Sequence, residues 1–207
     1  MKKCIRNHLV MIFVRNPELG RVKTRLAKSI GDQAALEIYN ILCKHTAKII
    51  SGIDADKLVF YSEDIQENDI WAELDCQKQI QTKGDLGQRM QQAFSSAFSL
   101  DYKKVIIIGS DIFSLRSKHI KSAFKQLETS DAVIGPAHDG GYYLLGLNFN
   151  IPNIFKHKQW GTSSVLEDTV SDLKKYNVNL LESLNDIDTY EDLKNEPQLL
   201  KQLNIHD

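Results

Sequence analysis

The stretch HLVMIFV at residues 8–14, followed by RNPELGRVKTR at residues 15–25, decides how this chain folds. Seven almost continuously apolar residues, several of them β-branched or bulky, are typical of a strand buried on both faces of a parallel sheet. Pro17 and Gly20 then break the strand pattern. The sequence therefore predicts a first β-strand that runs directly into a loop.

The predicted loop carries four cations, Arg15, Arg21, Lys23 and Arg25, on either side of Gly20. Glycine permits a positive φ or a close backbone approach, and the N–H groups of such a turn can surround a polyphosphate. Arginine adds a planar fork for phosphate oxygens and lysine adds a mobile point charge. We predict a phosphate-binding loop; the alternative is a solvated basic turn. Neither G-x-x-x-x-G-K-[ST] nor G-x-G-x-x-G occurs in the sequence.

Length and composition favour one α/β domain over residues 1–207, because 207 residues with 42% hydrophobic content can bury a full core. A net charge of -1 argues against general binding of nucleic acid, which needs a basic surplus. No stretch approaches the ~20 apolar residues of a membrane span. Cys4, Cys43 and Cys76 are far apart and lack C-x-x-C spacing, so we expect neither disulfides nor zinc, and a cytoplasmic location.

Strand patterns alternate with helical patterns along the whole chain, which predicts a mostly parallel central sheet flanked by helices. A helix is expected to follow Asp32 as its N-cap. The other predicted helices cover residues 86–98, 120–127, 163–176 and the segment from residue 189 onward. The other predicted strands cover residues 57–62, 79–82, 105–108, 132–134, 142–147 and 178–181.

Polar side chains follow several of these strands, at the sheet edge where α/β proteins bind ligands. Asp111 comes after the apolar strand at residues 105–108, so its carboxylate is expected to face whatever the basic loop holds. Magnesium usually takes one or two carboxylates plus substrate phosphates, which makes Asp111 a candidate ligand for a divalent ion. The alternative is an aspartate that caps a helix or forms a turn.

Asp139 lies in an Asp-Gly-Gly sequence between two predicted strands. This is a common hairpin turn, but His138, Tyr142 and Tyr143 crowd the same loop and offer a polar, aromatic surface for a ligand. A tyrosine pair in a strand is more often packing than recognition. Both interpretations of Asp139 therefore stay open at this point.

Six motifs together resemble the DUF2064 family, and they run over nearly the whole chain. They are F-x-R-x-P-x-x-G-x-V-K-T-R-L at 13–26, G-D-L-G-x-R-M at 84–90, G-S-D-I at 109–112, D-A-V-I-G-P-A-x-D-G-G-Y-Y-L-L-G at 131–146, W-x-T-S at 160–163 and D-I-D-T-x-E-D-L at 186–193. Members are described as transferases associated with radical SAM or selenium-domain proteins, or as arsenosugar-biosynthesis glycosyltransferases. The resemblance implies a nucleotide-diphospho-sugar transferase domain with a GT-A-like fold.

The resemblance also implies roles for individual positions. Arg15, Lys23 and Arg25, around the turn at Gly20, match the loop that holds the nucleotide phosphates, and Asp111 matches the metal-binding aspartate. It places Gly84, Asp85 and Gly87 near the base or ribose of the nucleotide. Arg89, in the first turn of the helix that follows, could reach the phosphates. Asp139, Gly140, Gly141 and Tyr142 match the family's second signature loop, and we expect them to bind substrate. We add Trp160, as core or lid, and Thr162 and Ser163, which are expected to start a helix and could cap it while facing the ligand.

Late in the chain, Asp188 is a candidate second metal ligand, with Asp186 as a weaker one beside Asp139, because superfamily relatives often supply a late ligand. The alternative is that Asp188 or Thr189 only caps the last helix. One departure from the family is Phe113, where proline commonly follows G-S-D-I. Loss of that proline is expected to loosen the turn without removing a ligand.

Three functions fit these expectations. In the first, Lys23, Arg25 and Asp111 with Mg²⁺ or Mn²⁺ transfer a nucleotidyl group from a nucleoside triphosphate to a small phosphorylated acceptor, releasing pyrophosphate. In the second, the same groups hold a nucleotide sugar and pass its sugar to a small acceptor. In the third, the chain binds nucleotide without catalysis. The single aspartate of Gly-Ser-Asp, in place of D-x-D, favours the first, the family's customary name favours the second, and the intact cluster disfavours the third.

Overall fold

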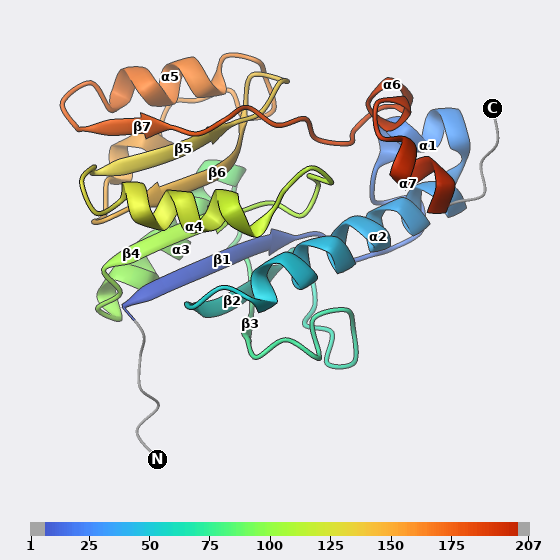
Figure 1. The fold of residues 1–207 in the computed structure, drawn as a ribbon, viewed down its shortest axis with the longest axis horizontal. Coiled ribbons are helices and arrows are strands. Elements are labelled where there is room, and N and C mark those ends of the chain that lie inside the picture. The colour runs from blue at the N-terminus through green and yellow to red at the C-terminus, as the bar shows by residue number, and fades with distance from the viewer. Residues whose placement is uncertain (1–6, 203–207) are drawn as a thin grey trace.

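Seven strands form one mixed sheet in the structure of the protein, a computed structural model that describes residues 7–202 (Figure 1). Cys4 lies outside the described residues. The strands are β1 (His8–Val14), β2 (Asp56–Tyr61), β3 (Gln77–Ile80), β4 (Lys104–Ile108), β5 (Ala132–Pro136), β6 (Tyr142–Leu147) and β7 (Val178–Leu180). Their order across the sheet is β3-β2-β1-β4-β6-β5-β7.

The sheet is mostly parallel, as the sequence predicted. β1 pairs in parallel with both β2 and β4, and β7 pairs in parallel with β5. Within residues 7–202, β6 alone runs antiparallel to its neighbours, β4 and β5. The short loop from β5 to β6 explains the reversal, because a parallel connection needs a crossover of a dozen or more residues.

Helices cover both faces of the sheet and one of its ends. They are α1 (Thr24–Ile30), α2 (Asp32–Ser51), α3 (Leu86–Ser99), α4 (Ser117–Gln126), η1 (Pro152–Phe155), α5 (Val165–Asp172), α6 (Tyr190–Lys194) and α7 (Pro197–Gln202). Residues of α2 and α4 pack on one face, and residues of α3 and η1 pack on the other. In Figure 1, α1, α6 and α7 gather at the end toward which β1 and β7 point.

Strand β4 shows why its run of apolar residues is continuous. Ile106 and Ile108 pack with α2 and α4, whereas Val105 and Ile107 pack with α3 on the opposite face. Side chains alternate between the two faces of a strand, so a strand covered on both sides needs an apolar residue at every position. The prediction of a buried central strand is confirmed.

A third apolar cluster fixes the end of the sheet where the site lies. It joins Leu26 of α1, Ile38 of α2, Ile187 and Leu193, together with Phe113. The Phe113 side chain is 7% exposed and its ring centroid lies 5.1 Å from that of His45. The residue that replaces the family's proline therefore packs in the core and holds the turn after Asp111 by burial.

The structure corrects the sequence prediction at four helix or strand boundaries. Helix α1 was not predicted, because it begins inside the expected basic loop, directly after Lys23 in the left-handed conformation at φ 49°. Asp32 is not the N-cap of α2; Gly31 holds that position and Asp32 is the first helical residue. Strand β3 begins two residues earlier than predicted, and α5 covers only Val165–Asp172 of the expected 163–176. Among the described residues, no helix is long and apolar enough to cross a membrane.

Candidate functional site

Two adjoining hollows lie at the carboxyl ends of β1, β4 and β5. The larger, which we call the cationic pocket, has a volume of about 700 Å³ and lies between the loop after β1, the end of β2 and the start of α3. The smaller, which we call the acidic pocket, has a volume of about 200 Å³ and lies between the β5–β6 loop and residues 160–165. Leu86, Gly109 and Asp111 line both. A ligand in one pocket can therefore touch a ligand in the other.

Arg15, Arg21 and Arg89 bring positive charge to the cationic pocket. The backbone of Arg15 is fixed by Tyr39, whose hydroxyl accepts from Arg15 N at 2.8 Å and donates to Arg15 O at 2.9 Å. Arg89 donates from Nε to Gly84 O at 2.8 Å and from Nη1 to Gln81 Oε1 at 3.3 Å. The lining is of mixed charge, because Glu18, Glu63, Asp85 and Asp111 line the same pocket and Arg21 Nη1 lies 3.0 Å from Glu18 Oε2. The guanidinium groups are the part of this lining that fits the phosphates of a nucleotide.

The predicted Gly84–Arg89 segment builds one wall of the cationic pocket at the start of α3. Asp85 is the N-cap, since its Oδ1 accepts from Gln88 N at 2.8 Å. Gly84 has φ +120°, and a Cβ there would lie 2.2 Å from Gln88 Oε1. Gly87 is buried, and a Cβ on it would lie 2.5 Å from Trp160 Nε1. Gly87 thus permits close packing of Trp160 and does not itself line either pocket.

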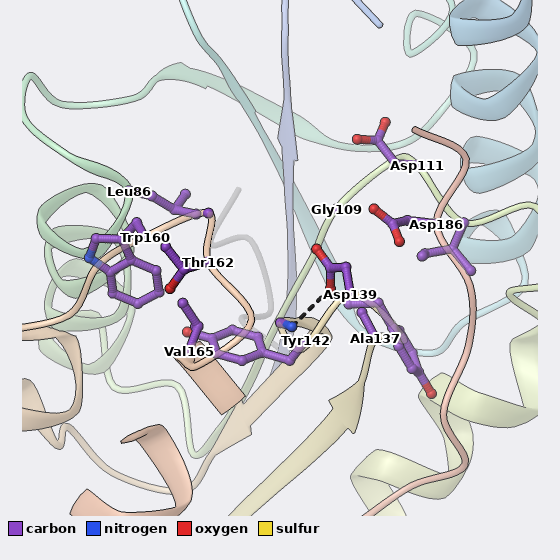
Figure 2. Close-up of a pocket in the computed structure, with 14 residues that line it drawn as sticks. Leu86, Gly109, Asp111, Ala137, Asp139, Tyr142, Trp160, Thr162, Val165 and Asp186 are labelled. Atoms are coloured by element: carbon purple, nitrogen blue, oxygen red, sulfur yellow. Dashed lines mark hydrogen bonds between the residues drawn. The ribbon is translucent and has the colours of Figure 1, made fainter. Parts of the chain in front are cut away.

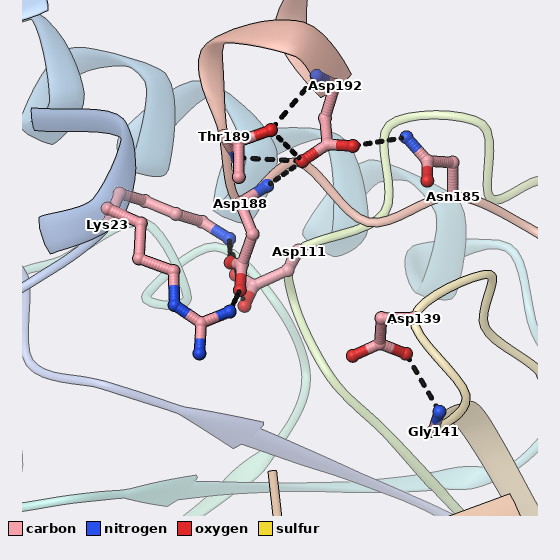
Figure 3. A network of polar contacts seen from close by, with 9 residues as sticks. Lys23, Asp111, Asp139, Gly141, Asn185, Asp188, Thr189 and Asp192 are labelled. Carbon is pink, nitrogen blue, oxygen red and sulfur yellow. Dashed lines mark hydrogen bonds and ion pairs between the residues drawn. The ribbon is translucent and has the colours of Figure 1, made fainter. Parts of the chain in front are cut away.

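Lys23 does not point into the cationic pocket but pairs with two aspartates (Figure 3). Its side chain is 2% exposed, and its Nζ lies 3.1 Å from Asp111 Oδ2 and 3.0 Å from Asp188 Oδ1. Burial disfavours the charged ammonium, but the two carboxylates outweigh this effect and raise the pKa of Lys23. Arg25 is 69% exposed, with Nη1 3.7 Å from Asp188 Oδ2. Gly20, at φ 74°, forms the turn before them.

Asp188 is free to pair with Lys23 because its neighbour caps the helix. Thr189 is the N-cap of α6, and Asp192 completes the capping box. Asp192 Oδ2 also accepts from Asp188 N at 3.2 Å, and its Oδ1 accepts from Asn185 Nδ2 at 3.3 Å. Of the two capping alternatives, the structure selects Thr189. Asp188 is thereby held at the site by its backbone while its carboxylate faces the cations.

The donor set suits a hard divalent ion held partly by substrate. The Oδ1 atom of Asp111 is buried without a hydrogen-bond partner, while its Oδ2 faces Lys23. Within residues 7–202, no three His, Cys, Asp or Glu side chains are grouped to hold a metal ion. An oxygen without a partner beside a phosphate-sized hollow fits Mg²⁺, which commonly takes one or two carboxylates and completes its shell with phosphate oxygens and water.

Asp139 both forms the hairpin turn and lines a pocket, so the two alternatives that the sequence left open are both present. Its Oδ1 accepts from Gly141 N at 2.8 Å, and Ala137 N donates to Gly141 O at 3.0 Å, so it belongs to the hairpin turn between β5 and β6. Its side chain is exposed and lines the acidic pocket together with Asp186 (Figure 2). The turn thus aims a carboxylate at the pocket.

Two variants of Asp139 separate its turn bond from its charge. Asp139→Ala is expected to lower the free energy of unfolding by about 1 kcal/mol, because the acceptor for Gly141 N is lost. Asp139→Asn keeps an acceptor oxygen and is expected to unfold at the wild-type urea concentration. Urea unfolding of the three proteins measures the difference, and equal midpoints would show that the turn does not need this bond.

Asp186 lies beside Asp139 on the same side of the acidic pocket and carries a raised pKa. Burial, the nearby charge of Asp139 and that of Asp188 together raise the pKa of Asp186 to about 6. Among the described residues, neither Asp186 nor Asp139 forms an ion pair with a Lys, Arg or His side chain. The pocket therefore keeps an uncompensated negative charge on this side.

The opposite side of the acidic pocket is apolar and aromatic. Figure 2 shows Leu86, Trp160, Thr162 and Val165 facing the three aspartates, with Tyr142 between the two sides. Thr162 lines the pocket but α5 begins only at Val165, so the expectation that Thr162 and Ser163 start the helix is wrong. The pocket is lined neither by Ser163 nor by Gly140.

Gly140 holds the 160–165 segment against the hairpin. It has φ +88°, and a Cβ on it would lie 2.2 Å from Ser163 O. Gly161 provides a matched position, with φ +84° but nothing within 4 Å of a Cβ. The two glycines thus share a backbone strain and differ in the space around them.

Gly140→Ala is expected to destabilise the protein by about 2 kcal/mol more than Gly161→Ala. Both variants strain the backbone, but only the first forces a methyl group into a neighbouring backbone. Thermal or urea unfolding of both proteins measures this difference. Equal stabilities would contradict the close approach of the hairpin to Ser163.

Several lining residues were not predicted from the sequence. In the cationic pocket they are Asn16, Ser62, Glu63 and Gln81, and Leu86 and Val165 line the acidic pocket. Ser62, Glu63 and Gln81 directly follow β2 and β3, so the rule that ligands bind after the strands could have found them. Leu86 and Val165 carry no such signal, because an apolar residue in a helix pattern predicts core.

A family model described as "Uncharacterized protein conserved in bacteria (DUF2064)" matches residues 46–162, more than half of the chain. A 2-phospho-L-lactate guanylyltransferase from Methanocaldococcus jannaschii is 31% identical over 134 residues, which make up 62% of this chain and 55% of that protein. The chain thus spans about half the length of the first curated relatives it matches.

Solved structures agree with the predicted fold. A protein from Desulfovibrio desulfuricans G20, provisionally named a nucleotide-diphospho-sugar transferase, superposes with a TM-score of 0.85 at 28% identity, covering 98% of this chain and 100% of that one. The 4-diphosphocytidyl-2C-methyl-D-erythritol synthase of Anaerococcus prevotii superposes at 0.61 with 13% identity, covering 94% and 98%. The predicted nucleotide-diphospho-sugar transferase fold is confirmed.

Proposed function

This chain belongs to the DUF2064 family, and from its two adjoining pockets we propose that it is a metal-dependent nucleotidyltransferase. The nucleoside triphosphate would lie in the cationic pocket, and a small phosphorylated acceptor would lie in the acidic pocket. An acceptor phosphate oxygen would form a bond to the α-phosphorus while the bond to the β-phosphate breaks and pyrophosphate leaves. The observation that carries the proposal is that Asp111 lines both pockets.

The residues of the chain have distinct tasks in this reaction. Arg15, Arg21 and Arg89 would bind and orient the phosphates. Arg25 lines neither pocket but lies 3.7 Å from Asp188, and it would reach the phosphates from outside. Lys23 would hold Asp111 and Asp188 together. A divalent ion held by Asp111, with Asp188 as its second ligand, would neutralise charge on the phosphates. The weaker candidates Asp139 and Asp186 line the acidic pocket, where they would face the acceptor instead of the ion.

The name of the Methanocaldococcus relative supports this reaction, since it describes the transfer of a guanylyl group to 2-phospho-L-lactate, a small phosphorylated acceptor. The name of the Desulfovibrio relative supports the second candidate, transfer of a sugar from a nucleotide sugar to a small acceptor. Both reactions use the same phosphate and metal groups. They differ in the product that leaves, which is pyrophosphate in the first and a nucleoside diphosphate in the second.

The deciding experiment measures both leaving groups. The protein is incubated with Mg²⁺ or Mn²⁺, each of the four nucleoside triphosphates, and a panel of small phosphorylated acceptors, and pyrophosphate is quantified. Parallel reactions contain nucleotide sugars, and nucleoside diphosphate is quantified. Acceptor-dependent pyrophosphate that disappears in excess chelator supports the proposal. If only nucleoside diphosphate is released, the reaction is glycosyl transfer. If neither product is detected, the protein only binds nucleotide.

A further inference from the structure

The acidic pocket is built as a separate place for a second ligand. It adjoins the cationic pocket at Leu86, Gly109 and Asp111, which line both. A molecule in the acidic pocket can therefore contact the phosphates of a nucleotide bound in the cationic pocket. Its volume of about 200 Å³ lies below the ~300–1,000 Å³ typical of drug-sized ligands. The pocket therefore fits a small acceptor of a few carbon atoms beyond its reacting phosphate.

The charges around this pocket are one-sided. Asp111, Asp139 and Asp186 line it, and none of the described residues that line it is Lys, Arg or His. Lys23 compensates Asp111 from behind, but neither Asp139 nor Asp186 has a cationic partner within residues 7–202. The cationic pocket differs in that Arg15, Arg21 and Arg89 accompany its carboxylates. An anionic group would be bound on the arginine side and repelled from the side of Asp139 and Asp186.

The shape of the pocket adds a second requirement. An ionised carboxylate only accepts hydrogen bonds, so the face of the ligand toward Asp139 and Asp186 must donate them. The opposite face meets Leu86, which is 44% exposed, and the rings of Trp160 and Tyr142 (Figure 2). A short carbon chain with hydroxyl groups along one side satisfies both walls, because C–H groups cover the apolar side and O–H groups reach the carboxylates.

We propose that the acidic pocket selects an acceptor whose only anionic group is its reacting phosphate, and that Asp139 and Asp186 enforce this by preferring a hydroxyl to a carboxylate. This inference rests on the proposed function, since it assigns the acceptor of that reaction. The class of acceptor is a small hydroxylated phosphate monoester, as opposed to a phosphorylated carboxylic acid.

The test uses pairs of compounds that differ only by CH₂OH in place of COO⁻. They are glycerol 3-phosphate with 3-phosphoglycerate, propane-1,2-diol 2-phosphate with 2-phospholactate, and 2-hydroxyethyl phosphate with phosphoglycolate. Affinity is measured through the fluorescence of Trp160 with nucleotide and Mg²⁺ present, and Trp160→Phe identifies the part of the signal that comes from the pocket. The rate of pyrophosphate release is measured on the same pairs.

In each pair, the hydroxyl compound is expected to bind at least tenfold more tightly, which corresponds to about 1.4 kcal/mol. Asp139→Asn and Asp186→Asn should each reduce this preference by improving the carboxylate compound. The matched control Asp101→Asn, an aspartate that is 85% exposed and lines neither pocket, should leave the preference unchanged.

The outcomes separate the inference from the proposed function. Equal or reversed affinities within the pairs, or no binding of any of the six compounds, would overturn the inference. Pyrophosphate release without the hydroxyl preference leaves the nucleotidyl transfer and removes the assigned acceptor class. A hydroxyl preference in binding without pyrophosphate from any nucleotide retains the acceptor class and removes the nucleotidyl transfer.

Discussion

Asp111→Asn is expected to lower turnover by about 1,000-fold while the protein stays folded. A metal ion that stabilises charge on phosphoryl oxygens lowers the activation free energy by several kcal/mol, and each ~1.4 kcal/mol corresponds to a factor of ten in rate. Asparagine keeps the shape of Asp111 but offers no negative charge to the ion. Folding should survive, because the Asp111 side chain is 43% exposed and Asp188 still pairs with Lys23 in this variant.

The measurement is the rate of acceptor-dependent pyrophosphate release with saturating nucleotide and Mg²⁺, together with circular dichroism of the same preparation. Asp101→Asn is a suitable control, since Asp101 is 85% exposed in the turn before β4, at the other end of the sheet. That variant should keep the wild-type rate. Wild-type turnover in Asp111→Asn would remove Asp111 from the catalytic site.

Lys23→Met should lower the free energy of unfolding by about 2–3 kcal/mol and reduce turnover as well. Removing one partner of a buried ion pair costs about 3–5 kcal/mol because it leaves a charge uncompensated. The partners here, Asp111 and Asp188, are 43% and 38% exposed, so water screens part of that cost. Turnover should fall because Lys23 would no longer hold Asp111, which follows β4, next to Asp188, which precedes α6.

Arg25→Met provides the comparison for Lys23→Met. Arg25 is 69% exposed and lies 3.7 Å from the same Asp188, so its removal should change stability by less than about 0.5 kcal/mol. Its effect is expected on nucleotide affinity, measured by calorimetry with a nucleoside diphosphate. Urea unfolding of both variants gives the stability difference. A Lys23→Met protein as stable as the wild type would show that the buried ammonium is not needed to balance the carboxylates.

The outcome for Lys23 illustrates where sequence reasoning stops. The spacing of cations after β1 predicted a phosphate-binding loop, and Arg15 and Arg21 do line the cationic pocket. Lys23 has the same charge and the same position in the pattern, yet its side chain is buried against Asp111 and Asp188. The difference depends on a left-handed residue and an unpredicted helix, which no charge pattern reveals.

Asp139 and Gly87 show the same limit in different ways. An Asp-Gly-Gly sequence is compatible with a turn and with a binding loop, and only the hydrogen bond to Gly141 and the position beside Asp186 show that the residue takes part in both. Gly87 was expected to lie near the nucleotide, but in the structure it is the indole of Trp160 that packs against it and leaves no room for a side chain. A glycine requirement can be read from the sequence, but the neighbour that creates the requirement cannot.

The sequence by itself determined the α/β fold, the order of most strands and helices, and the edge of the sheet where polar residues collect. These properties depend on local periodicity and on the break between a buried strand and its loop, which are visible along the chain. Tertiary structure alone decided which charges pair and which face a pocket. It also decided that the arginines line one hollow while its neighbour is lined, among the described residues, by aspartates without any cation. Lys23 lies 165 positions from Asp188, and such pairings arise only when the packing of distant segments closes the end of the sheet.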